Sequence, residues 1–498
     1  MHHRKLLATL VASLLSCTAA HASVDLIAMG DIDGSYQDLS TQTAAPLENG
    51  VPGNRFGGIG SGLAYAGGDT FIAIPDRGPN ANSYNSLVDD TVSYINRFQT
   101  MSLRLQPSDA GSALPFTLTP TLRATTLLSS RTPLVYGSGI GLGYQIDGYT
   151  LLGSGAPKLN FINHTYYFTG RSDNFDASRS STNPDNARLD PESIRVSRDG
   201  QSVFISDEYG PYVYQFDRAT GKRIRSYSLP ANLAITTLSS QKDIEIASNT
   251  IGRVTNKGME GLAITPDGRM LVGIMQANLE QDKKKSLRIV TIDVITGATH
   301  EYAYKLTDGS GVSDIVAVND HQFLVDERDG NGLADTPLLT DVASAATVKK
   351  LFLIDLNGAQ AVTSISGDLS SYAVPKTLFL DIVSKLTNAG MNPYFIPSKI
   401  EGVAFGQDVT INGVVKHTLY VANDNDFLAM IADPLKQPGD PTRGMVPNPN
   451  RFFVFAFSDG DLPGYVPQKI GEFHADECHD DHDHDHGHEH GHDDHWFW

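Results

Sequence analysis

The sequence has very little cysteine, with only Cys17 and Cys478 in 498 residues. Cys17 lies in an apolar N-terminal segment that we expect to be cleaved off, so the mature chain would keep a single thiol. An internal disulfide is then excluded, even in an oxidising compartment. The fold must therefore be held together by a large hydrophobic core, which a chain of this length can bury.

The sequence also lacks an excess of positive charge and a second long apolar run. It has 38 Lys and Arg against 57 Asp and Glu, for a formal net charge of −19. This charge argues against nucleic acid as a partner. No stretch is apolar for long enough to cross a bilayer, so we expect no integral membrane segment.

Several catalytic signatures are missing. No Gly-x-Ser-x-Gly sequence occurs, which removes support for a serine hydrolase of the α/β type. The glycine-rich stretch "GSGIGLGYQIDG" (137–148) lacks the Lys-Ser/Thr ending of a nucleotide-binding loop. An esterase activity would therefore be metal-assisted or would use a nucleophile that the sequence does not reveal.

Residues 1–22 are typical of a secretory signal peptide. They begin with basic residues, continue with an apolar run from Leu6 to Leu15, and end in Ala20-His21-Ala22. We predict cleavage after Ala22 and a periplasmic or secreted location. A lipoprotein acylated on Cys17 is the alternative.

Residues 474–498 have a different composition. They contain nine histidines, nine acidic residues and no Lys or Arg, and such a tract is expected to be disordered without metal. Imidazoles favour Zn²⁺, Ni²⁺ or Cu²⁺. We expect the ligands to be His482, His484, His486, His488, His490 and His492. The stretch 488–492 formally reads H-E-x-x-H, but Gly487 and Gly491 oppose the helix that a metalloprotease needs.

A β-hairpin pattern recurs along the rest of the chain. In residues 190–211 two β-rich runs, "SIRVS" and "SVFIS", flank the turn Arg-Asp-Gly-Gln. Similar hairpins occur at 58–80, 258–279, 311–332 and 398–427. Third strands are readable after several of them, in "PYVYQFD", "LRIVTIDV", "KLFLIDL" and "RFFVFAF".

Such repetition predicts an all-β fold, a β-propeller, built from radial blades. Five hairpins are readable, and we expect six blades in one domain spanning 23–473. Long insertions are expected at about 80–190 and 330–398. Within the second, residues 376–390 have helical spacing and a terminating glycine.

Each hairpin carries polar residues at the end away from its turn. The first strands begin near Glu192, Glu260, Asp314 and Glu401, and the earliest copy has Ser61 at this position. Because equivalent strand ends of a propeller converge around its axis, these carboxylates should form a ring. Unpaired carboxylates repel one another at low dielectric, and Ca²⁺ is the cation that accepts many oxygen ligands. The predicted metal ligands are Asp76, Glu192, Asp207, Glu208, Glu260, Glu327, Glu401, Asp424 and Asp426.

Two further features stand beside these acids. Arg77, Arg328 and Lys399 each neighbour a predicted ligand, so they could hold a substrate oxyanion or pair with an acid of the neighbouring blade. The stretch "DERDGNGLAD" (326–335) has oxygen ligands at spacings that suit a calcium loop, or it is a plain turn.

At these residues the sequence resembles a known family. The resemblance rests on "DPESI" with "SDEYGPYVYQFD", "GMEGLAITPDGRMLVGIMQ", "SDIVAVNDHQFLVDERD", and "KIEGVAF" with "VANDNDF". It is similar to the phytase-like family ("esterase-like activity of phytase") of secreted bacterial propellers. The resemblance implies a calcium-associated propeller with phosphatase, phytase or esterase activity.

We therefore expect a secreted or periplasmic calcium-dependent hydrolase of phosphoesters or related esters. The catalytic residues would be Glu208, Glu260, Arg77 and Lys399, acting on a small phosphorylated or esterified substrate. Two alternatives stay open, namely a non-catalytic metal-handling or ligand-binding propeller and a lactonase-type propeller. The oligomeric state is not predicted.

Overall fold

The computed structural model describes residues 24–80, 88–137 and 155–473. The predicted signal peptide and histidine-rich tail lie outside these residues. The described chain forms five antiparallel blades of four main strands each, together with short helices and two small two-stranded sheets. Within the described chain, no helix is both long and apolar enough to cross a bilayer.

Each blade is built outward from an innermost strand. Blade 1 contains β2 (Gly62–Tyr65), β3 (Thr70–Ile74), β4 (Arg97–Pro107) and β5 (Phe116–Leu127). Blade 2 contains β8 (Pro191–Val196), β9 (Ser202–Asp207), β10 (Tyr212–Asp217) and β11 (Arg223–Tyr227). Blade 3 contains β12 (Met259–Ile264), β13 (Met270–Met275), β14 (Ser286–Asp293) and β15 (Thr299–Lys305).

The last two blades follow the same order. Blade 4 contains β16 (Gly311–Ala317), β17 (Gln322–Arg328), β18 (Lys349–Asp355) and β19 (Lys376–Asp381). Blade 5 contains β20 (Lys399–Phe405), β22 (Val414–Asp424), β25 (Asn450–Phe457) and, outermost, β1 (Asp25–Ile32). The short strand β21 (Val409–Ile411) also pairs with β22.

The remaining elements lie between the blades' strands. The small sheets are β6 (Ser129–Ser130) with β7 (Tyr166–Tyr167), and β23 (Met430–Ala432) with β24 (Met445–Pro447). The α-helices are α1 (Lys158–Asn163), α2 (Lys242–Ser248) and α3 (Ile382–Asn388). The 3₁₀ helices are Thr41–Thr43, Ala231–Leu233 and Pro393–Phe395.

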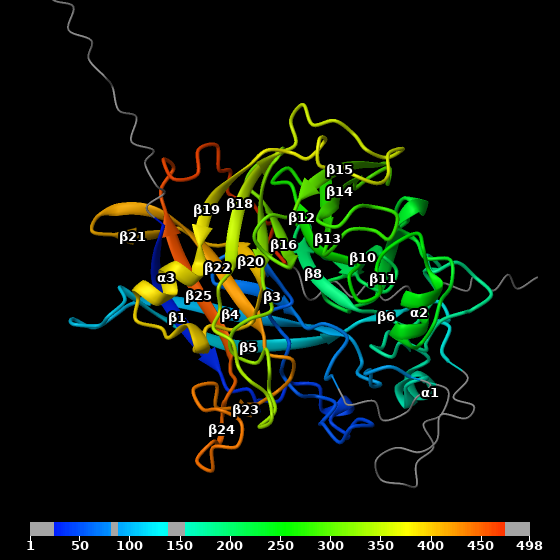
Figure 1. Cartoon of the computed structure of the whole chain (residues 1–498), viewed down its shortest axis with the longest axis horizontal. Helices are drawn as coiled ribbons and strands as arrows, with labels where there is room; N and C mark the ends of the chain where they lie inside the picture. The colour runs from blue at the N-terminus through cyan, green and yellow to red at the C-terminus, as the bar shows by residue number, and fades with distance from the viewer. Residues whose placement is uncertain (1–23, 81–87, 138–154, 474–498) are drawn as a thin grey trace, which may run out of the picture.

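The propeller has five blades, so the expectation of six was wrong. The N-terminal strand β1 completes blade 5 instead of starting another blade, as it runs antiparallel to β25 (Figure 1). Asp31 pairs with Arg451 there, with Oδ1 2.8 Å from Nε. The two ends of the described propeller are therefore joined within a single sheet.

Five hydrophobic clusters fill the gaps between neighbouring blades. Between blades 2 and 3, for example, Phe204 and Val213 pack with Leu262 and Leu271. A middle strand therefore buries both of its faces, which explains the nearly continuous apolar runs that the sequence shows at these strands.

The predicted third strands are confirmed as β10, β14, β18 and β25. The predicted insertion at 80–190 was partly wrong, because it contains β4 and β5, the outer half of blade 1. The predicted helix at 376–390 begins only at Ile382. Its first residues form the edge strand β19, and Asp381 caps α3 by accepting a hydrogen bond from the Ser384 N–H at 3.0 Å.

The inner strands β2, β8, β12, β16 and β20 surround the central channel. Neighbouring inner strands approach each other closely at glycine positions. A Cβ atom added at Gly261 of β12, for example, would lie only 2.8 Å from the Cα atom of Asp314 in β16. We call the end formed by the starts of the inner strands the mouth, and the opposite end the lower end.

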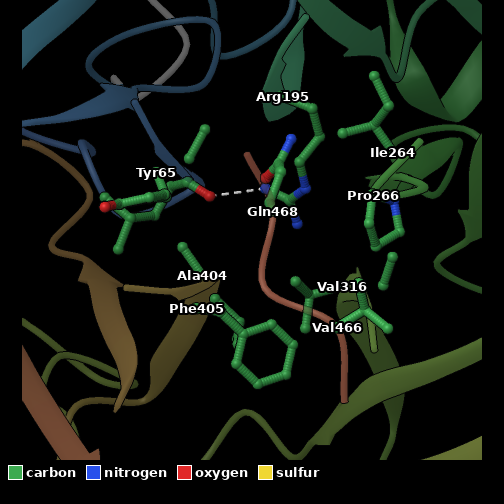
Figure 2. Close-up of a pocket in the computed structure, with 13 residues that line it drawn as sticks. Tyr65, Arg195, Ile264, Pro266, Val316, Ala404, Phe405, Val466 and Gln468 are labelled. Atoms are coloured by element: carbon green, nitrogen blue, oxygen red, sulfur yellow. Dashed lines mark hydrogen bonds between the residues drawn. The ribbon is translucent and has the colours of Figure 1, made fainter. Parts of the chain in front are cut away.

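The C-terminal segment 466–473 crosses the lower end. The Val466 N–H donates to Val318 O at 2.9 Å, and the Gly471 N–H donates to Arg198 O at 2.8 Å, linking blades 4 and 2. Figure 2 shows Val466 and Gln468 of this segment among inner-strand side chains such as Arg195, Ile264 and Phe405. Only a small pocket of about 20 Å³ remains there. The lower end is therefore largely filled, and the candidate functional site lies at the mouth.

Candidate functional site

A β-bulge near the start of four inner strands places one extra residue at the mouth. The pairing shifts by one residue between Pro191 and Ile194, Met259 and Gly261, Val312 and Ile315, and Ile400 and Gly402. Bulges re-aim side chains and are common next to active sites. By this register the equivalent residues are Glu192, Glu260, Ser313 and Glu401, with Ser61 in blade 1.

The residues at or just beyond the ends of the second strands form a matching set. Continuing the same register gives Asp76, Glu208, Gln276, Arg328 and Asp424. Blade 4 therefore contributes Ser313 and Arg328 where the other blades mostly contribute acids. The Arg328 Nε atom donates to Ser313 Oγ at 2.6 Å, so these two exceptions bind each other.

The structure brings three carboxylates of blade 2 into one group. Single oxygens of Asp190, Glu192 and Glu208 all lie within 4.8 Å of one another. Oxygens on opposite sides of a Ca²⁺ ion, each 2.3–2.6 Å from it, would be roughly 4.6–5.2 Å apart, so this spacing suits the ion. Asp190 was not among the ligands predicted from the sequence. Its position at the start of the same hairpin was the available signal.

Contacts between neighbouring blades close the ring of mouth residues. Arg77 binds Asp190 across blades 1 and 2, and the Gly258 N–H donates to Glu208 Oε1 at 2.9 Å across blades 2 and 3. Arg328 lies 4.0 Å from Glu260 of blade 3 and 2.5 Å from Glu401 of blade 5. The Asn80 side chain, which follows the blade 1 hairpin, donates to Asp426 of blade 5 at 3.1 Å and so links blade 5 to blade 1. Carboxylates from the hairpins of blades 1, 2, 3 and 5, together with Ser313 and Arg328 of blade 4, are thus brought to one mouth.

Negative charge exceeds positive charge in this group. Three cations, Arg77, Arg328 and Lys399, face nine carboxylates, which are Asp76, Asp190, Glu192, Asp207, Glu208, Glu260, Glu401, Asp424 and Asp426. One oxygen of Glu260, Oε2, is buried without a hydrogen-bond partner in the described chain. A buried carboxylate oxygen of this kind is costly unless it has a partner, such as a cation.

The crowding shows in the pKa values of the acids. Burial raises the pKa of Glu192 well above its usual range, and Glu260 and Asp190 raise it further. Burial raises the pKa of Glu260 in the same way, reinforced by Glu208 and Glu401. Burial, reinforced by Asp190, raises the pKa of Glu208 to about 7. A raised pKa favours the protonated form of each acid, and a bound cation would favour the ionised form instead.

The outer members of the group behave similarly. Burial raises the pKa of Asp76 well above its usual range, with Asp424 adding to the effect. Burial raises the pKa of Asp207 to about 7, although its Oδ1 accepts the N–H groups of Asp190 and Tyr209, each at 3.0 Å. Burial is also the largest cause of the raised pKa of Glu401 and Asp426.

The predicted basic residues are engaged in ion pairs with these acids. The Arg77 Nη1 atom lies 2.8 Å from Asp190 Oδ2, and the Lys399 Nζ atom lies 2.8 Å from Asp424 Oδ2. Lys399 also pairs with Asp426. Burial opposes the charge of Lys399, but Asp424 and Asp426 raise its pKa well above the usual value. These cations orient the carboxylates and leave part of their own surface at the mouth.

Two acids of blade 4 do not join the mouth group. Glu327 is fully buried and binds Lys376, the Tyr304 hydroxyl at 2.7 Å, and the N–H groups of Asp308 and Gly309. Asp314 lies below the mouth, where it pairs with Arg195. The sequence at the shared bulge explains the difference, because in β16 the mouth position is occupied by Ser313 and Asp314 stands one residue later.

In the stretch 326–335, Asp329 has hydrogen-bonding partners within the protein and, in the described chain, Asp326 has none. Asp329 pairs with Lys349 and accepts the Val348 N–H at 3.0 Å. Asp326 is fully buried, and neither of its carboxylate oxygens has a hydrogen-bond partner among the described residues.

The predicted tail ligands, His482 to His492, lie outside the described residues.

Comparison with known proteins agrees with the hairpin pattern. The model of the family described as phytase-like, "esterase-like activity of phytase", matches residues 54–427. The chain belongs to the phytase-like family. The match covers the inner hairpins of all five blades and ends just beyond Asp426.

Individual relatives are more distant. An uncharacterized secreted protein of Arthroderma benhamiae is 26% identical over 321 residues, which are 56% of this chain and 58% of that protein. The chain therefore spans a little over half the length of this curated relative. Among solved structures, it is similar to a luciferin-regenerating enzyme (10% identity, 89% of this chain and 100% of that one, TM-score 0.32). It is also similar to a gluconolactonase of Xanthomonas campestris (10% identity, 88% and 99%, TM-score 0.28).

Proposed function

We propose that this protein is a secreted, calcium-dependent hydrolase of phosphate esters or related esters. The observation that carries the proposal is the group of Asp190, Glu192 and Glu208, whose oxygens lie within 4.8 Å of one another inside a larger excess of carboxylates. Membership of the phytase-like family supports ester hydrolysis. The secreted relative supports an extracellular location.

The donor set fits a hard divalent cation. All three groups offer carboxylate oxygens. Calcium prefers such ligands and tolerates irregular geometry, whereas the site offers no sulfur or imidazole for softer metals. A bound Ca²⁺ would neutralise a substrate oxyanion, polarise its ester and lower the pKa of a nearby water.

Residues of the protein would accept the proton and hold the cation. Glu260 is the proposed proton acceptor, because its Oε2 atom is unpaired while its Oε1 atom is fixed by the Gln276 amide at 2.7 Å. Burial, the main cause, raises the pKa of Glu260, which makes its carboxylate a stronger base. Glu208 holds the cation and couples blade 2 to blade 3 through Gly258.

Arg77 and Lys399 have a second role in this scheme. Each is fixed by an ion pair, Arg77 to Asp190 and Lys399 to Asp424, so its position does not depend on substrate. Prepositioned cations stabilise negative charge that develops on a phosphoryl or carbonyl oxygen without reorganising. We propose that Arg77 and Lys399, which come from the neighbouring blades 1 and 5, both contact the substrate oxyanion.

The test is a substrate panel of phosphomonoesters, carboxylic esters and lactones. It is run on purified protein with excess calcium and again with EDTA. We expect turnover of a phosphomonoester or carboxylic ester that EDTA abolishes and calcium restores. Turnover of lactones alone would favour a lactonase, and no turnover with any class would favour a binding propeller.

A further inference from the structure

A second polar pocket lies beside the mouth. It has a volume of about 90 Å³, and its lining includes Arg77, Ser172, Arg188, Tyr209, Lys242 and Asn256. Arg77 belongs to both sites, since its Nη1 atom binds Asp190 while its side chain lines the pocket. Tyr209 directly follows Glu208 in the chain. A molecule bound at the candidate cation site could therefore extend into this pocket.

Arg188 is the unusual residue of the pocket. It is only 3% exposed, and its guanidinium carbon lies 4.8 Å from the ring centroid of Phe175 and 5.0 Å from that of Tyr209. Its Nη1 atom donates to Ser172 O at 3.3 Å. Its Nη2 atom is buried and has no hydrogen-bond partner among the described residues.

Arg188 also makes no direct ion pair, and Glu245 and Asp207 stabilise its charge only from a distance. Within the described chain no carboxylate oxygen lies within 4.0 Å of it, although buried cations in proteins are normally paired. The acids that line the pocket already have partners. Lys242 pairs with Asp90 at 3.0 Å and Asp89 at 4.0 Å, Arg253 pairs with Glu245 at 2.8 Å, and Arg77 pairs with Asp190.

We propose that this pocket binds an anionic group, a phosphate or a carboxylate, with Arg188 as its principal ligand and Lys242 at its rim. An oxyanion there would give Arg188 Nη2 the acceptor that it lacks and would balance its charge. The partly buried rings of Phe175 and Tyr209 on the guanidinium hold its plane fixed for such a contact.

This site defines a substrate class for the hydrolase. The substrate would carry a second negatively charged group at some distance from the ester that is cleaved. This part of the inference rests on the proposed function, whereas anion binding by the pocket does not. A free phosphate ion has the same chemistry as a substrate phosphate, so the experiment must separate the two sources.

The first experiment measures the affinity of the pocket for phosphate in the absence of calcium. Inorganic phosphate is titrated calorimetrically into the metal-free protein in EDTA, where the mouth itself repels anions. We expect saturable binding by the wild type and a loss of about 10–100-fold in affinity in Arg188→Gln, the amount expected for a charged hydrogen bond. Arg269→Gln is the matched control, because Arg269 is exposed, with 81% of its side chain accessible, and lies in the β12–β13 turn at the lower end of the propeller.

Lys242→Gln provides a second variant that should fold normally, since the Lys242 side chain is 46% exposed. It should weaken phosphate binding about threefold to tenfold, because it removes a rim charge and leaves Asp89 and Asp90 unpaired. The proposal is overturned if metal-free wild-type protein does not bind phosphate, or if both variants bind it as tightly as the wild type.

The second experiment separates a substrate group from a free ion. Initial rates are measured for two phenyl phosphates that differ only in a carboxylate on the ring. Arg188→Gln should raise KM for the carboxylated compound and leave KM for the plain one unchanged. If Arg188→Gln loses phosphate binding but changes KM equally for both phenyl phosphates, the pocket binds free phosphate. That result would overturn the proposed substrate class. Glu192→Gln, in contrast, should lose calcium binding and keep phosphate binding in EDTA, so failure of the cation site is recognised separately.

Discussion

Arg195 and Asp314 meet across the propeller axis, with the Arg195 Nη2 atom 2.9 Å from Oδ1 and 2.8 Å from Oδ2 of Asp314. The pair connects the inner strands of four blades, because Arg195 also donates to Leu63 O at 2.6 Å and Asp314 accepts the Val403 N–H at 3.0 Å. The Leu63 contact is the dashed line in Figure 2. This buried ion pair thus fills the central channel between the mouth and the lower end of the propeller.

Removal of one partner should be strongly destabilising. Asp314→Asn leaves the Arg195 guanidinium buried without a counter-charge, which costs about 3–5 kcal/mol of unfolding free energy. Denaturant unfolding of the wild type and the variant measures this loss. A change below about 1 kcal/mol would show that the pair does not hold the inner strands together.

Glu192→Gln should change stability in opposite directions with and without calcium. In the metal-free protein it removes one of several mutually repelling carboxylates, so the melting temperature should rise. With calcium it removes a ligand, so the stabilisation by the ion should be largely lost. Thermal melts in EDTA and in calcium measure both effects. Glu472→Gln, an exposed glutamate near the lower end, is the control and should behave as the wild type. A Glu192→Gln variant that keeps the full calcium-dependent increase would remove Glu192 from the site.

Glu327→Gln should destabilise the protein without changing its calcium affinity. Glu327 is fully buried and pairs with Lys376, so the loss of its charge should cost about 3 kcal/mol. Calorimetric titration of the folded variant should give the calcium affinity of the wild type. Weaker calcium binding in this variant would place Glu327 among the ligands after all.

The metal-free protein should become less stable as pH rises from about 4.5 to 7. Glu208 has its folded-state pKa raised to about 7 by burial and by Asp190, so between these values the folded state binds more protons than the unfolded state. Stability is therefore greatest below the unfolded pKa and falls as pH rises through the folded pKa. Calcium should flatten this dependence, because the cation replaces the protons. Thermal melts across this pH range test both parts, and a metal-free stability that increases toward pH 7 would contradict them.

The hairpins and much of the candidate site could be predicted from the sequence. The turn at Asp199-Gly200 and the apolar runs around it fix a hairpin locally, and Glu192, Glu260 and Glu401 occupy equivalent positions because three hairpins have the same bulge. The family resemblance, which the family match confirms, relied on the same residues.

Other features depend on contacts that a local pattern does not contain. In β16, Asp314 stands one residue after the mouth position, and only the pairing of Val312 with Glu327 reveals that Ser313 is the equivalent of Glu260. The blade number depends on β1, which pairs with a strand more than 400 residues away. Arg188 gave no sequence signal, because its lack of a direct ion pair is a property of the packed structure.

The most direct test of the account is a calorimetric titration of calcium into metal-free wild-type protein, performed in two buffers of different ionisation enthalpy. We predict saturable binding with a dissociation constant of about 10⁻⁴ M or tighter and a release of protons, seen as a difference in heat between the buffers. We expect that release because burial raises the pKa values of Glu192, Glu208 and Glu260. Absence of calcium binding, or binding that Asp190→Asn, Glu192→Gln and Glu208→Gln all leave unchanged, would contradict the central claim that the mouth carboxylates form a cation site.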